Sequence, residues 1–512
     1  MARDAAAGVA RRDRPDSAIE RRTYVAAAAY ALLLLATASQ FGTWTDEEYT
    51  LATTAHGAAH AWRRAIDFEV QAPLYFTLLG LWRKLDGDVW FARAFSILSA
   101  TALFATLPGL LRRVVPGRDS FWAAVAIAFN PFVVFMALDI RLYAFALLLT
   151  AIGFMAFDAG FASGGSARAR LAFVATGVVA LYTQYFLVFV MIGYGVALAA
   201  LRRWRRCREY VLVSCAIGVA ALPLLAILHA QVGKSGETTA TAAQLLRQTA
   251  LHPWLEFVLP ADPALDRYGG RYVYDAIALL LAVLVWRTSP RLTRRSLAAL
   301  VCAGTIEAIF IAVVLALRLD LEPRHYVALF VPLVLAAYGV YAAVDTKNRI
   351  AGRVLAGTYL ALTAFVLVRQ YHAFAQMGDT KRVAAYLAAH ARPGAIVAVF
   401  PADALPAYAR QYRGTARLVP FPKALPPDRF DVDAIDVRDE AEATAAFARL
   451  RYAPQLWLVT MGSCADGRKE YGCDRVLAAV HAGARIRDEQ HFYLATTYDL
   501  DVRRPPSSQA RR

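Results

Sequence analysis

The sequence predicts a polytopic α-helical membrane protein that ends in an extracytoplasmic α/β domain. Hydrophobic residues make up 58% of the 512 residues, and the mean hydropathy of +0.40 is well above that of soluble globular domains. After residue 371 the long apolar runs stop, and amphipathic segments alternate with short apolar strings: AIVAVF, QLWLVTM and, near the end of the chain, HFYLATTYDL. Alternation of this kind indicates the helices and strands of a small α/β domain.

Apolar runs that approach the length of a bilayer-spanning helix recur through residues 23–371, the predicted transmembrane domain. A spanning helix needs about 20 residues, and several runs are shorter, so about eleven spans are expected. The first run lacks a small-residue cleavage site and is expected to be an anchor, not a signal peptide. Residues 1–22 are charged and free of aromatics, which predicts a disordered cytoplasmic tail. The runs occupy residues 24–41, 90–111, 119–138, 142–161, 170–184, 186–201, 209–230, 272–287, 296–317, 325–343 and 350–371.

Lys and Arg gather in alternate connections between the runs, which predicts that these connections are cytoplasmic. All of them fall on one side only if residues 73–84 do not cross, so residues 42–89 are placed wholly outside, with interfacial helices among them. This pattern accounts for the net charge of +16 without nucleic acid, because the arginines form no single stripe. We therefore expect a multi-pass protein of the inner (plasma) membrane. Its basic connections are residues 11–22, 112–118, 168–170, 202–208, 287–295 and 347–353.

Three carboxylates, Asp46, Glu47 and Glu48, follow the first run directly and should emerge at the membrane surface. A carboxylate cluster gains nothing from anionic lipid, unlike Lys or Arg at such an interface. One interpretation is a functional site. The other is a helix cap, in which Thr45 or Asp46 is the N-cap and Glu48, near the third helical position, completes a capping box.

Two further polar segments, DIRLYAF and LEPRHY, lie at predicted outer ends of spans. Asp139 and Arg141 could also neutralise each other as a purely structural ion pair, and this interpretation stays open. With the acidic segment, these segments gather carboxylates and guanidinium groups on one outer surface. Their polar side chains are Asp139, Arg141, Tyr143, Arg324, His325 and Tyr326.

Transfer of a sugar from a lipid phosphate needs both kinds of group. A carboxylate takes the proton of the acceptor hydroxyl as this oxygen attacks the anomeric carbon. Cations hold the departing phosphate, whose negative charge grows in the transition state. The polyprenyl chain of such a donor lies in the bilayer, which accounts for a site at the membrane boundary.

The order of these features resembles the GT-C glycosyltransferases, and within them the bacterial branch related to protein O-mannosyltransferases and the lipid A aminoarabinose transferase. One span is followed by Asp-Glu-x-Tyr at Asp46, by Pro-Leu-Tyr ending at Tyr75, by Arg93 at the next span, and by Arg-x-Tyr at Arg141. The resemblance covers residues 24–345 and is strongest over residues 41–145. It implies an enzyme that moves a hexosyl or pentosyl group from a polyprenyl-phosphate-linked donor to a hydroxyl of a glycan, lipid or protein acceptor.

The resemblance also implies a role for each matching residue. Asp46 matches the catalytic base, and Glu47 matches a residue that supports the base or a metal ion. Whether Asp46 and Glu47 bind a divalent metal stays open. Positions near the donor phosphate are matched by Arg141, Tyr143, Arg324 and Tyr326. Supporting positions are matched by Asp139, His325, Gln71 and Tyr75.

Two residues depart from the family pattern. Many relatives have His-Pro-Pro-Leu-Tyr where this chain has Gln71-Ala-Pro-Leu-Tyr75, so any role of that His is lost or passes to Gln71. The acid before Arg-x-Tyr is often Glu, and Asp139 is one methylene shorter. Acceptor choice is expected to rest on the outer loop 231–271 and on the C-terminal domain.

Residues 372–512 form the predicted extracytoplasmic α/β domain. Cys464 and Cys473 are its two cysteines, and in an oxidising compartment they would close a short loop as a disulfide, with a stabilisation of about 2–3 kcal/mol. A metal clip is disfavoured because no second Cys or His pair accompanies them.

Two other classes of function compete with the enzyme. A lipid or solute transporter without chemistry is favoured by Glu307, because a carboxylate in mid-membrane often marks an ion path. The sequence shows no inverted repeat and no paired broken helices, which such a transporter would be expected to have. A membrane-anchored binding protein that acts through the α/β domain would leave the acidic segment unexplained.

Overall fold

The computed structural model divides the chain into two compact units. The first unit comprises Met1–Ala38, Gln71–Pro260 and Ile277–Ala364, and the second comprises Ser39–Val70, Ala261–Ala276 and Phe365–Arg512. The second unit therefore includes part of the predicted outer loop 42–89 as well as the C-terminal domain. The structure describes residues 17–231, 240–261, 270–319, 321–371, 377–426, 435–450, 452–462, 464 and 470–502.

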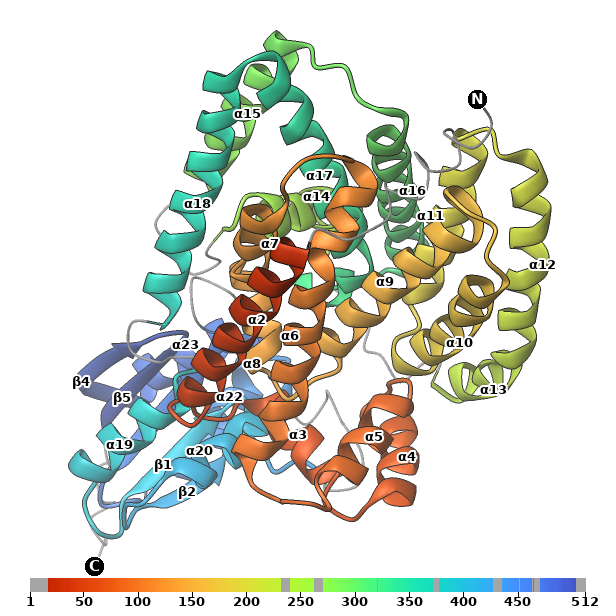
Figure 1. Cartoon of the computed structure of the whole chain (residues 1–512). Helices are drawn as coiled ribbons and strands as arrows, with labels where there is room; N and C mark the ends of the chain where they lie inside the picture. The colour runs from red at the N-terminus through yellow and green to blue at the C-terminus, as the bar shows by residue number, and fades with distance from the viewer. Residues whose placement is uncertain are drawn as a thin grey trace, which may run out of the picture. The chain divides into compact units, whose positions relative to one another are not determined.

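Every predicted apolar run is helical in the structure (Figure 1). The first helix begins at Ser17, earlier than the predicted run, so the end of the predicted tail is helical. The helices are α2 (Ser17–Ala38), α6 (Val89–Val114), α7 (Phe121–Ala128), α8 (Pro131–Leu138), α9 (Tyr143–Phe157), α10 (Ala167–Thr183), α11 (Leu187–Ala200), α12 (Trp204–Ala220), α13 (Leu222–Gln231), α15 (Gly270–Thr288), α16 (Arg294–Leu317), α17 (Val327–Lys347) and α18 (Arg349–Tyr371).

Fewer helices than the predicted eleven or so meet the length and apolarity of a membrane span. In the part of the chain that the structure describes, five stretches do so, or seven if each of two bent pairs counts as one span. Helix α11 has 14 residues, which is shorter than the bilayer requires, and α10 with 17 residues lies at the lower limit. The five stretches are Val89–Val114, Tyr143–Ala162, Arg294–Leu317, Pro323–Lys347 and Arg349–Tyr371.

The two bends occur where proline interrupts an apolar run. Helices α7 and α8 meet at 57°, and α12 and α13 at 55°. Pro131 and Pro223 stand at the start of the second helix of each pair, where the missing N–H of proline costs no helical hydrogen bond. Asn130 caps α8, because its Oδ1 accepts from the N–H of Phe132 at 2.9 Å.

Three short helices follow the first long one. They are α3 (Thr45–Thr53), α4 (Ala58–Asp67) and α5 (Leu74–Trp82), with 9, 10 and 9 residues. None of the three is long enough to cross a bilayer. Helices α3 and α4 belong to the second unit, and α5 belongs to the first.

The C-terminal domain is built on a five-stranded sheet with strand order β2-β1-β3-β5-β4. The first three strands are parallel, and β5 and β4 add an antiparallel hairpin. The predicted strand at the end of the chain is in fact this hairpin, with its turn before Ala495. The strands are β1 (Ile396–Phe400), β2 (Arg417–Pro420), β3 (Leu456–Met461), β4 (Ala484–Phe492) and β5 (Ala495–Val502).

Helices cover both faces of the sheet. Alternate residues of a strand point to opposite faces, so Phe400 packs with α22 (Glu440–Ala448) and α23 (Cys473–Gly483) on one face. Val399 packs with α19 (Thr380–His390) and α20 (Leu405–Gln411) on the other face. Because helices cover both faces of the sheet, the sequences of β1 and β3 are continuous runs of mostly apolar residues.

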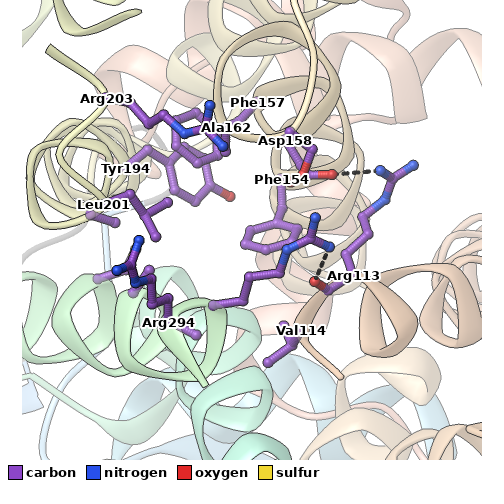
Figure 2. A pocket seen from close by; sticks show the side chains of 16 residues that line it. Arg113, Val114, Phe154, Phe157, Asp158, Ala162, Tyr194, Leu201, Arg203 and Arg294 are labelled. Carbon is purple, nitrogen blue, oxygen red and sulfur yellow. Dashed lines mark hydrogen bonds and ion pairs between the residues drawn. The ribbon is translucent and has the colours of Figure 1, made fainter. Parts of the chain in front are cut away.

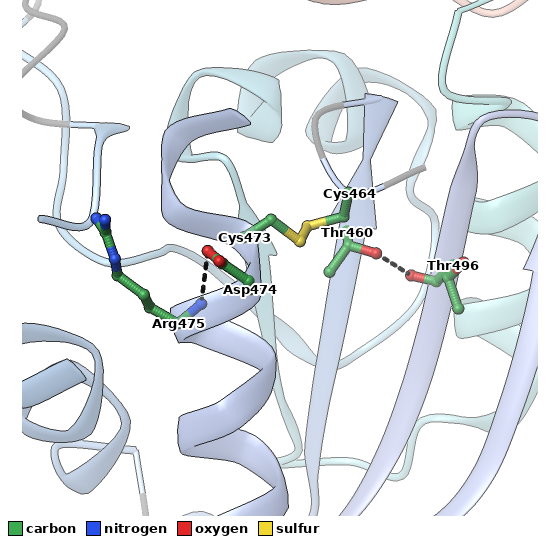
Figure 3. Close-up of a disulfide and its surroundings, with 6 residues drawn as sticks. All are labelled: Thr460, Cys464, Cys473, Asp474, Arg475 and Thr496. Carbon is green, nitrogen blue, oxygen red and sulfur yellow. Dashed lines mark hydrogen bonds between the residues drawn. A yellow bond between two sulfur atoms is a disulfide. The ribbon is translucent and has the colours of Figure 1, made fainter. Parts of the chain in front are cut away.

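A disulfide joins the segment after β3 to the first residue of α23 (Figure 3). It links Cys464 to Cys473, whose Cα atoms are 5.4 Å apart. The link lies beyond the carboxyl end of β3.

Candidate functional site

The acidic triplet occupies the first turn of α3. The helix begins at Thr45, with Trp44 as N-cap, so Glu47 and not Glu48 stands at the third helical position. The predicted cap with Thr45 or Asp46 as N-cap is therefore wrong by at least one residue, and Trp44 makes no side-chain cap hydrogen bond. Carboxylates in the first turn are favoured by the partial positive charge of the helix N-terminus.

Glu48 holds α3 to the α/β domain through Arg410 of α20. Arg410 Nη2 donates to Glu48 Oε2 at 2.7 Å, and Arg410 Nε donates to the other carboxylate oxygen. The side chain of Glu48 is 7% exposed and that of Arg410 is 43% exposed. Two parallel charge-assisted hydrogen bonds to a buried carboxylate fix the orientation of the helix as well as its position.

The segment before α3 is held by the start of α19. Thr380 Oγ1 donates to the carbonyl of Thr43 at 2.6 Å, and Lys381 Nζ donates to the carbonyl of Gln40 at 3.2 Å. Gly42 passes so close that a Cβ there would lie 2.3 Å from Thr380 Oγ1. The acidic segment and the residues before it are therefore held against α20 and α19 of the C-terminal domain, both by side-chain hydrogen bonds and by the close approach of the backbone at Gly42.

Asp403 adds a buried carboxyl group to this part of the second unit. It follows β1 in the short helix η5 (Ala402–Ala404) and is 8% exposed. Within the described residues its Oδ1 has no hydrogen-bond partner. Burial first, and then the negative charge of Asp46, raise the pKa of Asp403 to about 7. A carboxyl group tuned to neutral pH beside a second carboxylate is typical of acid–base sites.

Tyr49 brings a hydroxyl group to the same carboxylates. Burial is the main cause that raises the pKa of Tyr49, and the charges of Asp403, Asp46 and Glu69 raise it further. Its ring packs edge-to-face on Phe68, with centroids 5.0 Å apart. Tyr49 is thus a phenol at neutral pH and can donate a hydrogen bond among acids.

Asp403 lies where the topology of the sheet favours a functional residue. From β1 the chain turns to β2 at one edge, and from β3 it turns to the hairpin at the other edge. The carboxyl ends of β1 and β3 therefore flank a switch point, the usual position of ligand sites in open α/β sheets. Sequence reasoning missed Asp403, although an acid directly after a parallel strand is a usable signal. No feature of the sequence marked Arg410 as the partner of Glu48.

The first unit brings the two predicted phosphate-binding segments together. Tyr143 begins α9, and its ring meets the ring of His325 edge-to-face with centroids 6.5 Å apart. Arg141 is buried, and its Cζ lies 5.9 Å from the ring centroid of Phe76 on α5, within cation–π distance. Asp139, fully buried, is the C-cap of α8.

Arg324 lies in the short helix η4 (Pro323–Tyr326), where it forms an ion pair of 2.6 Å with Glu322. His325 Nδ1 accepts a hydrogen bond from the N–H of Glu322 at 3.0 Å, so its remaining proton is on Nε2. Tyr326 is buried and shares a hydrogen bond of 3.0 Å with the hydroxyl of Thr249 on α14 (Ala242–Pro253).

The remaining predicted residues also lie in the first unit. Tyr75 is fully buried in α5, and the carbonyl of Gln71 accepts a hydrogen bond from Gln231 Nε2 at 3.4 Å. Asp46 and Glu47, by contrast, belong to the second unit. Much of the outer loop 231–271 lies outside the described residues.

Three or more metal-binding side chains of His, Cys, Asp or Glu do not come together anywhere in the part of the chain that the structure describes. Glu48 is engaged by Arg410, whereas Asp403 lies near enough to Asp46 for the charge of Asp46 to raise its pKa. Mg²⁺ can bind through one or two carboxylates when substrate phosphates complete its shell.

Comparison with known proteins gives structural neighbours only. No family model and no curated protein matches the chain. The crystal structure of ArnT from Cupriavidus metallidurans in the apo state is similar, with a TM-score of 0.48 and 13% identity over 93% of this chain and 97% of that one. The structure of ArnT from the same organism bound to undecaprenyl phosphate gives a TM-score of 0.46 and 14% identity, with the same coverage.

Proposed function

We propose that the chain is an integral-membrane glycosyltransferase that moves a sugar from a polyprenyl-phosphate-linked donor to an acceptor hydroxyl on the extracytoplasmic side. The contact between Tyr143 and His325 carries the proposal. It joins two Arg-x-Tyr segments that are 183 positions apart in the chain, from Arg141 to Arg324. Two guanidinium groups beside aromatic rings suit a phosphate attached to an apolar chain.

In the first unit, Arg141 and Arg324 would hold the donor phosphate. Arg324 already binds the carboxylate of Glu322, which is 52% exposed, so a phosphate would replace one exposed anion with another. Arg141 is packed by Phe76 and keeps its charge in a water-poor setting, where a charge-assisted hydrogen bond is strong. Tyr143 and Tyr326 would support these arginines.

In the second unit, Asp46 would act as the general base. It would take the proton of the acceptor hydroxyl while the new bond forms between the acceptor oxygen and the anomeric carbon. The bond between the anomeric carbon and the phosphate oxygen breaks, and its electron pair leaves with the polyprenyl phosphate. Glu47 and Asp403 would offset the changes in charge and protonation at Asp46 during the reaction.

The transporter is the second candidate, and Glu307 is its main support. In the structure Glu307 Oε1 accepts a hydrogen bond of 2.9 Å from Trp254 Nε1. Trp254 starts the π-helical turn η2 (Trp254–Val258). Because this carboxylate has its own hydrogen-bond donor, a structural role explains why it stands there, and ion transport is not needed to explain it.

The test compares wild type with four variants of the full-length protein in nanodiscs. Polyprenyl-phosphate sugars of several kinds are offered, and release of free polyprenyl phosphate and donor binding are both measured. Asp46→Asn keeps the shape of the side chain but cannot accept a proton, so turnover should fall by about 10²–10⁴ with little change in donor binding. Arg141→Ala and Arg324→Ala should weaken donor binding as well.

Matched controls and the fourth variant separate the two functions. Asp67→Asn and Arg318→Ala change exposed residues of the same types and should leave turnover within about twofold. A transporter predicts no bond cleavage by wild type, and a greater effect of Glu307→Gln than of Asp46→Asn. Wild-type sugar transfer by Asp46→Asn would exclude Asp46 as the base and direct the search to Glu47.

A further inference from the structure

A cavity of about 230 Å³ lies within the first unit, remote in sequence from the residues discussed so far (Figure 2). Its walls come from the end of α6, from α9 and the π-helical turn η1 (Asp158–Ala162) that continues it, from α11 and the connection that ends at Arg203, and from the N-terminal part of α16. The basic residues among them belong to connections that the sequence predicts to be cytoplasmic. This cavity is therefore a candidate site on the side opposite to the proposed sugar transfer.

Positive charge dominates the lining of the cavity. Four arginines face a single carboxylate, Asp158. Asp158 is fully engaged, because Oδ2 pairs with Arg113 at 2.7 Å and Oδ1 accepts from Ser163 Oγ at 2.6 Å. The other three arginines, Arg203, Arg294 and Arg295, have no acidic partner among the residues that the structure describes. The site thus carries an excess of three positive charges.

Two helix N-termini add to this potential. Helix α12 begins next to Arg203, which is its N-cap residue and makes no side-chain cap hydrogen bond. Helix α16 begins at Arg294. With 17 and 24 residues, both helices are long enough to carry a full partial positive charge at their N-termini. Such ends bind phosphate through backbone N–H groups.

The interior of the cavity is aromatic. The rings of Phe157 and Tyr194 stack with centroids 4.6 Å apart, and Phe154 lies edge-to-face against Tyr194. Figure 2 shows these rings among the side chains of Arg203 and Arg294. An apolar interior with a cationic rim is complementary to an amphiphile whose anionic group is a phosphate. The adjoining π-helical turn is a feature often found at functional sites.

We propose that this cavity binds a phosphate group, supplied by an anionic membrane lipid whose first apolar carbons enter the aromatic interior. The guanidinium groups of Arg203 and Arg294 contact the phosphate, and Arg295 is held in place by its hydrogen bond of 3.0 Å to the carbonyl of Arg113. This lipid site is independent of the proposed glycosyltransferase activity. Free phosphate offers the same anionic chemistry, and the experiment distinguishes the two sources.

The test uses the delipidated full-length protein in detergent, with native mass spectrometry to count bound lipid. The probes are phosphatidylglycerol, zwitterionic phosphatidylcholine and inorganic phosphate. Phosphatidylglycerol should bind more tightly than phosphatidylcholine by about tenfold or more, because only the former has an uncompensated phosphate charge. The double variant Arg203→Gln/Arg294→Gln should lose this preference, whereas Arg203→Lys/Arg294→Lys should keep most of it.

The matched control is Arg202→Gln/Arg205→Gln. It removes the same number of charges, both of them from the segment that contains Arg203, but neither residue lines the cavity. Phosphatidylglycerol binding within about twofold of wild type in this control supports a specific site. Equal losses in both glutamine variants, or no preference for phosphatidylglycerol in wild type, would overturn the proposal in favour of diffuse surface charge. Tight binding of inorganic phosphate that Arg203→Gln/Arg294→Gln abolishes supports the anion site with free phosphate as its source.

Discussion

Replacing Asp403 with asparagine should stabilise the second unit at alkaline pH more than at acidic pH. The ordinary pKa of an aspartate is 3.8, and burial and the neighbouring Asp46 raise that of Asp403 to about 7. The folded chain therefore binds this proton more tightly than the unfolded chain. The stabilisation is fully present below the unfolded pKa and is lost as pH rises towards the folded pKa.

The size of the effect follows from the two pKa values. At pH 8 the ionised Asp403 costs about 4 kcal/mol relative to a neutral side chain, and at pH 5 the cost is about 2 kcal/mol. Asparagine is neutral at every pH and has the shape of the protonated acid. The advantage of Asp403→Asn in the free energy of unfolding should thus grow by roughly 2–3 kcal/mol between these pH values. For a unit of this size, such a change raises the unfolding midpoint by roughly 4–12 °C.

The assay is pulse proteolysis of the full-length protein in detergent over a temperature series at both pH values. Cleavage of the C-terminal domain reports on the second unit without requiring the membrane helices to unfold. The control is Asp501→Asn on β5, because Asp501 is half exposed and pairs with Arg487 at 2.9 Å on the surface. Its effect should stay below about 1 kcal/mol at both pH values. An advantage of Asp403→Asn that is equal at pH 5 and pH 8 would refute the raised pKa.

Two further predictions concern the seating of α3 and the orientation of the chain. Arg410→Ala should lower the free energy of unfolding by about 2 kcal/mol, because it leaves Glu48 buried without its cation. A double-mutant cycle with Glu48→Gln should show a coupling free energy of about 1–2 kcal/mol between the two side chains. Strictly additive effects of the two substitutions would contradict the ion pair. Cysteines introduced at Ala58 and Ala441 should react with a membrane-impermeant thiol reagent applied from outside, whereas one at Ala167 should not. Labelling of Ala167 alone would reverse the orientation and remove the proposed site from the outer side.

The helical part of the fold was predictable because hydrophobicity is a local property. Each predicted run coincides with helix. Even the bend between α7 and α8 has a signal in the sequence, because Pro131 cannot continue the helix before it. The number of spans was not predictable from the runs, because a run can form a helix that is apolar but too short to cross a bilayer, as α11 with its 14 residues does. The apolar string at the end of the chain contains a turn before Ala495 that its composition does not indicate, so that one expected strand is a hairpin.

The candidate site was predictable only in part. The acidic triplet and the Arg-x-Tyr segments stand out locally, and the structure joins the latter through Tyr143 and His325. The pairing of Glu48 with Arg410 spans 362 positions and depends on how α3 packs against α20. No local pattern encodes such a contact. The burial that raises the pKa of Asp403 likewise exists only after the sheet and its helices have assembled.

Under the proposed function, the contacts that hold the acidic segment would give the C-terminal domain a part in catalysis that the sequence did not suggest. With only 9 residues, α3 would be marginal as an isolated helix, and a misplaced base loses much of its effect. Arg410 and Thr380 fix this helix and the chain before it on the α/β domain. Acceptor choice was the role expected for that domain. Acceptor choice stays a prediction. Under the proposed function, the contacts also make this domain the support that positions Asp46, and Asp403 would be the group through which it adjusts the proton affinity of the site.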